Sequence, residues 1–194
     1  MPTADNLRSI ELYRRTAAGY DASTGPTWPI RMRCIERLTL RPGETVLDVG
    51  CGTGLSGPSL RALGYQDIAG LDLSPEMLAI ADTRGVYGEL KQAMLGAALP
   101  WPDGHFRAFL SAGVFTLGHA PASGLHELVR MTRRGGHGIF TVRDQVLDAG
   151  GFRAVFNTLE REGRWRTVEE SPWYRCYAVG DPGAHVKTFV FEVL

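Results

Sequence analysis

Short apolar segments alternate with segments of helical spacing through the middle of the chain. Residues 46–49 form an apolar run that is followed by glycines, which is typical of a strand buried on both faces. Residues 55–63 carry apolar side chains at helical spacing, and a second apolar run follows at 68–73. Ser74 and Pro75 then suit the N-cap and the first position of another helix. This pattern predicts strand, helix, strand and helix in succession.

The alternation continues along the rest of the sequence. Further strands are expected at 87–91, 106–112 and 138–142, and helices at 125–132 and 152–159. Gly135 and Gly136 should break the chain ahead of the strand at 138–142. Two late strands, near 164–177 and 186–193, have no helix between them and should form an antiparallel hairpin at one edge of the sheet. We therefore predict a single α/β domain over 1–194, with an N-terminal helical cap (1–40) and a three-layer core (41–194) around a mostly parallel sheet.

A glycine-rich segment joins the first predicted strand to its helix. Gly50, Gly52 and Gly54 alternate there, two residues after Asp48. Ligands of open α/β sheets lie beyond the carboxyl ends of the strands, and glycines let the backbone approach a ligand closely. Asp72 ends the next strand, where a carboxylate can accept hydrogen bonds from both hydroxyls of a ribose. The segment therefore predicts a site for a ligand that contains a nucleoside.

Residues 52–57 also match the G-x-G-x-x-G pattern of dinucleotide-binding proteins, which leaves an NAD-type oxidoreductase as one alternative. Asp48 disfavours this interpretation because a carboxylate inside the strand would repel a pyrophosphate. A zwitterionic or cationic ligand tolerates the same carboxylate better.

Taken together, residues 46–54 and 70–78 resemble the two cofactor-binding signatures of class I S-adenosylmethionine (SAM)-dependent methyltransferases. The segments at 18–21, 51–55 and 84–87 are most similar to small methyltransferase-like proteins of the Williams–Beuren-region type. The resemblance implies a Rossmann-like sheet, SAM as cofactor and S-adenosylhomocysteine (SAH) as product. The cofactor-binding residues that it implies are Asp48, Gly50, Cys51, Gly52, Thr53, Gly54, Asp72, Leu73, Met77, Met94 and Leu95.

The resemblance assigns a part of the cofactor to most of these residues. The three alternating glycines would surround the methionine part, with Asp48 just behind them, and Asp72 would hold the ribose. Leu73 would lie against the adenine. Leu95 stands where many relatives have an aspartate, so backbone groups near Met94 and Leu95 would recognise the adenine instead. Two further departures, Arg107 in place of Asp and Arg134 in place of Pro, are expected to be structural.

The acceptor site should form from the N-terminal helices and the loops after the fourth and fifth strands. Methyl transfer from a sulfonium is an in-line displacement, in which positioning supplies much of the rate and a general base is optional. His119 is a candidate base in the loop at 113–119, with a hydrogen-bonded loop histidine as the alternative. Tyr20 is the second catalytic candidate, favoured as a lid over the cofactor rather than as a proton carrier, with a packing role as the alternative. Arg143 could recognise an anionic acceptor or pair with Asp144, and Trp28 is a weaker candidate.

Composition narrows the classes of partner. Lysine plus arginine equals aspartate plus glutamate at 21 each, so the formal net charge is zero and general nucleic-acid binding is not expected. Arg130, Arg133 and Arg134 cluster locally, which a solvated helix end explains. The three cysteines are widely spaced, which favours neither a disulfide framework nor a zinc site, and no metal is expected.

The sequence also leads to expectations about location and assembly. It shows no signal-peptide pattern and no apolar run near the ~20 residues that cross a bilayer, so we expect a cytoplasmic protein that does not enter the membrane, as a monomer or homodimer. The function we expect is SAM-dependent methylation of an O, N or S nucleophile on a small-molecule acceptor. The alternative from another class is a non-catalytic regulatory protein that binds SAM or SAH.

Overall fold

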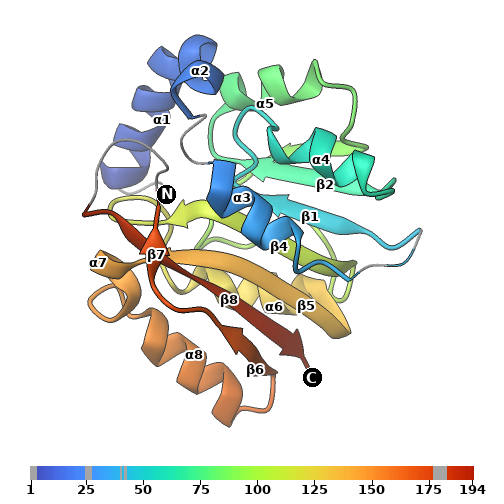
Figure 1. Ribbon diagram of the computed structural model, residues 1–194, viewed down its shortest axis with the longest axis vertical. Helices are drawn as coiled ribbons and strands as arrows, with labels where there is room; N and C mark the ends of the chain where they lie inside the picture. Colours follow the sequence, from blue (N-terminus) through green and yellow to red (C-terminus); the bar gives the residue numbers. More distant parts are fainter. Residues whose placement is uncertain (1–3, 25–27, 40, 42, 177–182) are drawn as a thin grey trace.

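A computed structural model describes residues 4–24, 28–39, 41, 43–176 and 183–194. Its centre is a sheet of eight strands in the order β3-β2-β1-β4-β5-β8-β6, with β7 paired to β8 (Figure 1). Strands β1 to β5 pair in parallel, whereas β8 runs antiparallel to β5, β6 and β7. The strands are β1 (Val46–Val49), β2 (Ile68–Asp72), β3 (Glu89–Gln92), β4 (Phe106–Phe115), β5 (Thr132–Arg143), β6 (Trp165–Glu170), β7 (Tyr174–Arg175) and β8 (His185–Val193).

Helices cover both faces of the sheet. Apolar side chains of α6, α7 and α8 pack in one cluster with Phe109 and Phe140, and those of α3 and α4 pack in a second cluster with Val46 and Ile139. The helical segments are α1 (Ala4–Thr16), a 3₁₀ turn η1 (Ala17–Gly19), α2 (Tyr20–Thr24), α3 (Trp28–Ile35), α4 (Ser56–Ala62), α5 (Pro75–Asp82), α6 (Gly124–Met131), α7 (Asp144–Leu147) and α8 (Phe152–Arg161).

The predicted fold class is confirmed: a mostly parallel, three-layer α/β sheet with an antiparallel C-terminal pair. The predicted N-cap of α5 is also present, since the Ser74 hydroxyl accepts the Met77 N–H at 3.2 Å. Within the predicted cap, α3 packs into the helical layer with Cys34 and Ile35 fully buried, whereas α1 and α2 lie above the sheet edge (Figure 1).

Several predicted strand boundaries are wrong, and the strand expected near 164–177 is divided into β6 and β7. Strand β4 continues to Phe115, three residues beyond the expected end, through an irregularity in its pairing with β5. Strand β5 begins at Thr132 and passes through Gly135 and Gly136, where a break was expected. A Cβ on Gly136 would lie 2.5 Å from the Arg107 carbonyl oxygen, so this glycine permits a bulge inside the strand rather than ending it.

The last strand is placed inside the sheet rather than at its edge. Strand β8 lies between β5 and β6, so β6 is the edge partner of the antiparallel pair. The reversal expected near 180–183 falls mostly outside the described residues. No helix in the described part of the chain has the length and apolar character of a membrane span.

Candidate active site

A cavity opens beyond the carboxyl ends of β1, β2 and β4. Its inner wall comes from the ends of β2 and β4, from the segments that follow β1 to β4 and from Met77 of α5. Its outer wall comes from Ser9, Tyr13 and Tyr20 of α1 and α2. Its volume is about 730 Å³ including the open mouth, within the ~300–1,000 Å³ range of small-molecule sites. The inner wall is made by Gly50, Gly52, Leu71, Asp72, Leu73, Met77, Ala93, Met94, Leu95, Ala112, Gly113, Val114, His119 and Ala120.

The glycine loop passes closely between this cavity and the protein interior. Gly50 and Gly52 have φ angles of +65° and +55°, which L side chains rarely adopt. A Cβ on Gly50 would lie 2.3 Å from Cγ2 of Val114, so packing alone requires glycine there. A Cβ on Gly52 would meet Tyr20 at 3.8 Å, across the cavity mouth. The loop therefore leaves space where a side chain would stand.

Asp72 is held at the end of β2 by backbone donors. The Gly52 N–H donates to Oδ2 at 2.8 Å, and the Ser74 N–H donates to Oδ1 at 2.9 Å. Burial raises the pKa of Asp72, and the two N–H groups oppose that shift because they favour the carboxylate. The acid borders the cavity with an orientation fixed by the glycine loop, as expected for a group that accepts ribose hydroxyls.

Asp48 lies behind the glycine loop rather than on the main cavity. The Tyr87 hydroxyl donates to its Oδ2 at 2.7 Å, and burial raises the pKa of Asp48 to about 6. With Cys51 and Thr53 it borders a smaller polar cavity of about 340 Å³. Asp48 thus lies just behind the glycine loop, and its relation to the cofactor stays a prediction.

The structure separates the eleven predicted cofactor residues into three groups. Those on the main cavity are Gly50, Gly52, Asp72, Leu73, Met77, Met94 and Leu95. Asp48, Cys51 and Thr53 border the smaller cavity, as do Gly50 and Gly52. Gly54 borders neither of these two cavities, so its expected place around the methionine part stays a prediction. A Cβ on Gly54 would lie 2.8 Å from Tyr87 and 3.0 Å from the Ala81 Cβ, so it serves the packing of α5.

His119 and Tyr20, the predicted catalytic candidates, both border the main cavity. The Nδ1 of His119 lies 3.0 Å from the Leu117 carbonyl oxygen, and its Nε2 lies 2.8 Å from the Tyr13 hydroxyl. A carbonyl oxygen only accepts, so Nδ1 carries the proton and Nε2 of the neutral ring accepts from Tyr13. The Tyr20 ring meets the Tyr13 ring edge-on at 6.0 Å. His119 is therefore a hydrogen-bonded loop residue on the cavity wall, and its role as a base stays a prediction.

Sequence reasoning missed Ser9 and Tyr13. They are four residues apart on α1, so they share one helix face and both point at the loop that carries His119. The Ser9 hydroxyl donates to the Gly118 carbonyl at 3.3 Å. The signal available in the sequence was the spacing of Ser9, Tyr13 and Ala17 along one stripe of the helix.

Hydrogen bonds and an ion pair join α2 to the glycine loop. The Thr53 hydroxyl donates to Oδ1 of Asp21, and Arg84 donates to Oδ2, both at 2.5 Å. Arg84 also donates to the Thr53 carbonyl oxygen at 2.5 Å. We call Asp21, Thr53 and Arg84 the α2 latch, because they join the outer wall of the cavity to its inner wall.

The remaining candidates lie away from the main cavity. Arg143 contacts the Asp144 carboxylate at 3.5 Å, which is the ion-pair alternative for this residue, and Arg143 does not border the cavity. The side chain of Trp28 lies outside the described part of the structure. Arg107 pairs with Glu44 at 3.3 Å and bonds to the Gly135 carbonyl oxygen, which is the structural role expected of it.

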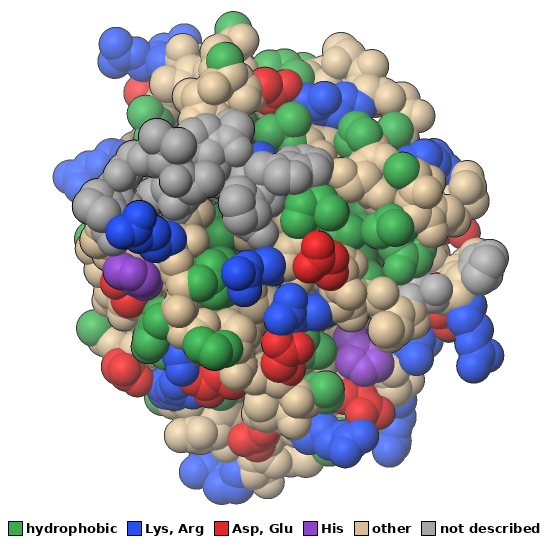
Figure 2. All heavy atoms as spheres, viewed as in Figure 1, with side chains coloured by type: hydrophobic (Ala, Val, Ile, Leu, Met, Phe, Trp, Pro, Cys, Tyr) green, Lys and Arg blue, Asp and Glu red, His purple; other side chains and the backbone are tan. Residues whose placement is uncertain are grey.

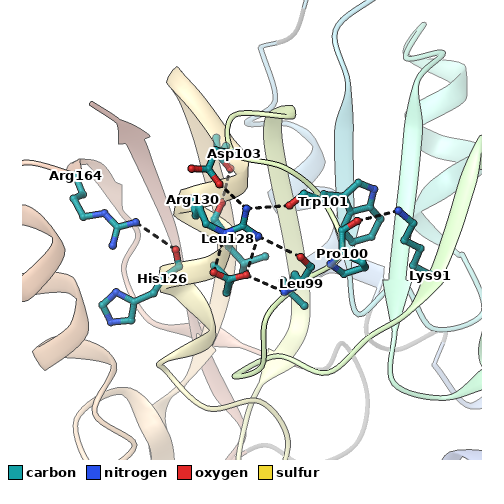
Figure 3. A network of polar contacts seen from close by, with 11 residues as sticks. Lys91, Leu99, Pro100, Trp101, Asp103, His126, Leu128, Arg130 and Arg164 are labelled. Carbon is teal, nitrogen blue, oxygen red and sulfur yellow. Dashed lines mark hydrogen bonds and ion pairs between the residues drawn. The ribbon is translucent and has the colours of Figure 1, made fainter.

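Arg130, in the last turn of α6, is the centre of a polar network (Figure 3). It pairs with Glu127 and Asp103 and donates to the carbonyl oxygens of Leu99 and Trp101. The charge of the arginine cluster around residue 130 is therefore partly neutralised, and Arg130 stabilises the 99–103 loop. Among the described residues, no group of three or more His, Cys, Asp or Glu side chains is arranged to hold a metal ion.

Comparisons of sequence identify similar proteins over most of the chain. A family described as "Methyltransferase domain" matches residues 47–140. Human "Methyltransferase-like protein 27" is 31% identical, over 91% of this chain and 76% of the relative. The 18S rRNA (guanine(1575)-N(7))-methyltransferase of Saccharomyces cerevisiae is 41% identical. The matched part covers 41% of this chain and 29% of that enzyme. A malonyl-[acyl-carrier protein] O-methyltransferase of Serratia marcescens is 32% identical over 72% of this chain and 54% of its own length.

Comparisons of structure show the same fold in more distant proteins. One chain from the complex between the Haloferax volcanii Trm112 methyltransferase activator and a methyltransferase superposes with a TM-score of 0.76, at 17% identity, over 95% of this chain and 96% of that one. The [4+2]-cyclase SpnF superposes with a TM-score of 0.72, at 16% identity, over 99% and 96% of the two chains. Since a cyclase shares the fold, the chemistry has to be argued from the site and the sequence relatives.

Proposed function

Because the chain belongs to the class I SAM-dependent methyltransferase family, we propose that it methylates an O, N or S nucleophile of a small-molecule acceptor. The proposal of a small-molecule acceptor is based on the outer wall of the cavity. Tyr13 and Tyr20 line the outer side of the cavity, and the Tyr13 hydroxyl contacts Nε2 of His119. A covered cavity of this size suits a small molecule better than a polymer.

The residues of the cavity fit SAM. Gly52 presents no Cβ toward the ligand space, and Asp72 is a buried carboxylate at the position that would accept the ribose hydroxyls. Leu73, Met77 and Leu95 provide apolar surface for the adenine. When bound, SAM supplies a methyl group on a sulfonium, which is already activated for displacement.

The surface charge supports a small acceptor. On the face seen in Figure 2, basic and acidic side chains are interspersed rather than separated. Arg153 and Lys187 both pair with Glu170, and Arg37 pairs with Glu169. A general nucleic-acid binder needs a field of one sign to attract phosphates, and the formal net charge of this chain is zero.

The experiment has two stages. Calorimetry with SAM, SAH and NAD should give binding for the first two ligands, whereas binding of NAD alone would contradict the cofactor assignment. Methyl uptake from labelled SAM should then be measured with pools of small O, N and S nucleophiles beside ribosomal RNA and total protein. Label in the small-molecule pools supports the proposal, and label confined to RNA or protein refutes the acceptor class.

His119 is assigned the role of base toward the acceptor. Its Nε2 is the unprotonated nitrogen on the cavity wall and can take a proton from a hydroxyl or ammonium acceptor, directly or through the Tyr13 hydroxyl. His119→Ala should lower the methylation rate roughly 10²–10⁴-fold, the usual range for one general base. SAH affinity should change little.

The control for His119 is His126→Ala on α6, which is absent from the cavity wall and should retain the wild-type rate. A pH–rate profile separates base catalysis from positioning. If the lower limb of the profile survives in His119→Ala, His119 does not accept the proton.

A further inference from the structure

A second groove lies at the end of the sheet opposite the main cavity. We call it the arginine groove, because it is lined by Arg130, Arg133, Arg134 and Arg164. It is open to solvent, with a volume of about 700 Å³ including its open mouth, and it lies where β5 begins and β8 ends. The main cavity lies beyond the carboxyl ends of β1, β2 and β4, which run parallel to β5, so the two sites are at opposite ends of these strands.

The arginines of this groove come from different elements. Arg130 is in the last turn of α6, Arg133 and Arg134 are at the start of β5, and Arg164 directly precedes β6. Asp103 is the one acidic side chain among the described residues that line the groove. Folding therefore adds Arg164 to the cluster that the sequence shows at 130–134, and positive charge is in excess there.

The charges of these arginines are not used equally. Arg130 pairs with two carboxylates and stabilises the neighbouring loop (Figure 3). Arg164 donates to the carbonyl oxygen of His126 at 3.5 Å, which is a neutral acceptor. Arg133 and Arg134 are exposed, and their guanidinium groups have no hydrogen bond or ion pair with another described residue. The groove therefore presents guanidinium donors that the described part of the chain leaves without a carboxylate.

An acidic segment of another protein fits this groove better than a small anion or a nucleic acid. Small-molecule sites bury roughly 70–90% of their ligand, whereas an anion in an open groove keeps much of its contact with water. Leu194 is 41% exposed beside the arginines and offers an apolar contact, which suits a side chain rather than a phosphate backbone. Arginine is enriched in protein interfaces, where its planar fork forms charge-assisted hydrogen bonds with carboxylates.

We propose that the arginine groove is an interaction surface for an acidic, leucine-containing segment of a partner protein. Arg133, Arg134 and Arg164 bind carboxylates of the partner, and Leu194 contacts one of its apolar side chains. Because the main cavity lies at the other end of the parallel strands, a partner in the groove leaves that cavity accessible. The interaction is separate from methyl transfer, so it is testable without the acceptor.

The test uses a labelled peptide that carries the proposed chemistry. Fluorescence anisotropy measures how the full chain binds a fluorescein-labelled peptide of repeated Glu-Glu-Leu units and its Gln-Gln-Leu counterpart. The acidic peptide should bind and the neutral one should not. Binding of the acidic peptide should weaken as salt is added, because exposed charges are screened.

A double variant locates the peptide on the protein. Arg133→Gln and Arg134→Gln, made together, should lower affinity for the acidic peptide roughly 3- to 30-fold, the range for two exposed ion pairs. The matched control is Arg15→Gln with Arg175→Gln. It removes two exposed arginines of α1 and β7, outside the groove, for the same change in net charge, and should bind as wild type does. Urea unfolding checks that both double variants are folded.

Several results would overturn the inference. Equal affinity of wild type and the Arg133→Gln, Arg134→Gln variant would place the peptide elsewhere on the surface. No binding of the acidic peptide, or equal binding of the neutral one, would remove the role of charge. Tighter binding of pyrophosphate or of a short oligouridylate, with the same loss in the double variant, would make the groove a phosphate or RNA site instead.

Discussion

At the scale of single residues, Gly52 combines a positive φ with a Cβ position that is open toward the cavity. Its φ of +55° is unfavourable for a β-branched residue, and a side chain there would extend toward Tyr20. We expect Gly52→Val to abolish SAH binding, measured by calorimetry, while urea unfolding stays cooperative.

Gly64→Val is the matched control for Gly52→Val. Gly64 also has a positive φ, +92°, but nothing lies within 4 Å of its Cβ position. The Gly64→Val variant should lose about 1–2 kcal/mol of stability through backbone strain and keep its SAH affinity. Wild-type SAH affinity in Gly52→Val would move the cofactor away from this loop.

Asp48 should make stability depend on pH. Burial raises its folded-state pKa to about 6, above the ~3.9 of an unfolded chain, so the folded state holds the extra proton between these values. The contribution of this group therefore favours folding at low pH and is lost as pH rises from about 4 to 6. Asp48→Asn lacks the titration but can still accept the Tyr87 hydroxyl.

The expected result is a difference between variant and wild type that grows with pH. The free energy of unfolding of Asp48→Asn minus that of wild type should rise by about 2–3 kcal/mol between pH 4 and 7, from two pKa units at 1.36 kcal/mol each. Urea unfolding at several pH values measures it. Parallel profiles for the two proteins would mean that Asp48 titrates alike when folded and unfolded.

At the scale of elements, polar contacts help to hold α1 and α2 over the cavity. They include the α2 latch, the Ser9 contact with Gly118 and the Tyr13 contact with His119. Asp21 is partly exposed, so its ion pair with Arg84 is screened. Asp21→Ala should speed SAH dissociation roughly 3- to 10-fold, corresponding to about 1 kcal/mol, with global stability nearly unchanged.

Stopped-flow dissociation measures this effect, and hydrogen exchange should show faster opening of α1 and α2. The control is Glu11→Ala, which removes an exposed ion pair with Arg14 inside α1 and leaves the α2 latch intact. Equal dissociation rates for Asp21→Ala and wild type would show that the two helices do not gate the site.

At the scale of the whole molecule, an aromatic cluster joins the parallel and antiparallel parts of the sheet. Phe140 of β5 is fully buried and meets Phe109, Phe156 and Phe191 at centroid distances of 5.6–5.9 Å. Because one ring contacts β4, α8 and β8, these elements should unfold together. Phe140→Ala should cost about 3–5 kcal/mol in a single urea transition.

Val168→Ala on β6 is the control, because Val168 is exposed and its truncation should change stability by less than ~0.5 kcal/mol. Two separate transitions in Phe140→Ala would show that the C-terminal strands fold apart from the parallel sheet.

Much of the fold and of the candidate site could be predicted from local pattern. Strand β1 has the predicted bounds, Ser74 caps α5 as predicted, and seven predicted residues border the main cavity. The reason is that burial periodicity, caps and glycine loops are encoded within about ten neighbouring residues. The carboxyl ends of parallel strands meet at one edge, so the glycine loop and Asp72 had to lie together.

The sequence by itself determined the sheet class, the glycine loop and the acid after β2, because these depend on local spacing and on a general rule of α/β topology. Only the tertiary structure decided which distant side chains complete the site. Tyr13 meets His119 across 106 positions of sequence, and Gly54 turns toward Tyr87 rather than toward a cavity. Such contacts depend on how helices pack over the sheet edge, and the spacing of neighbouring residues carries no record of that packing.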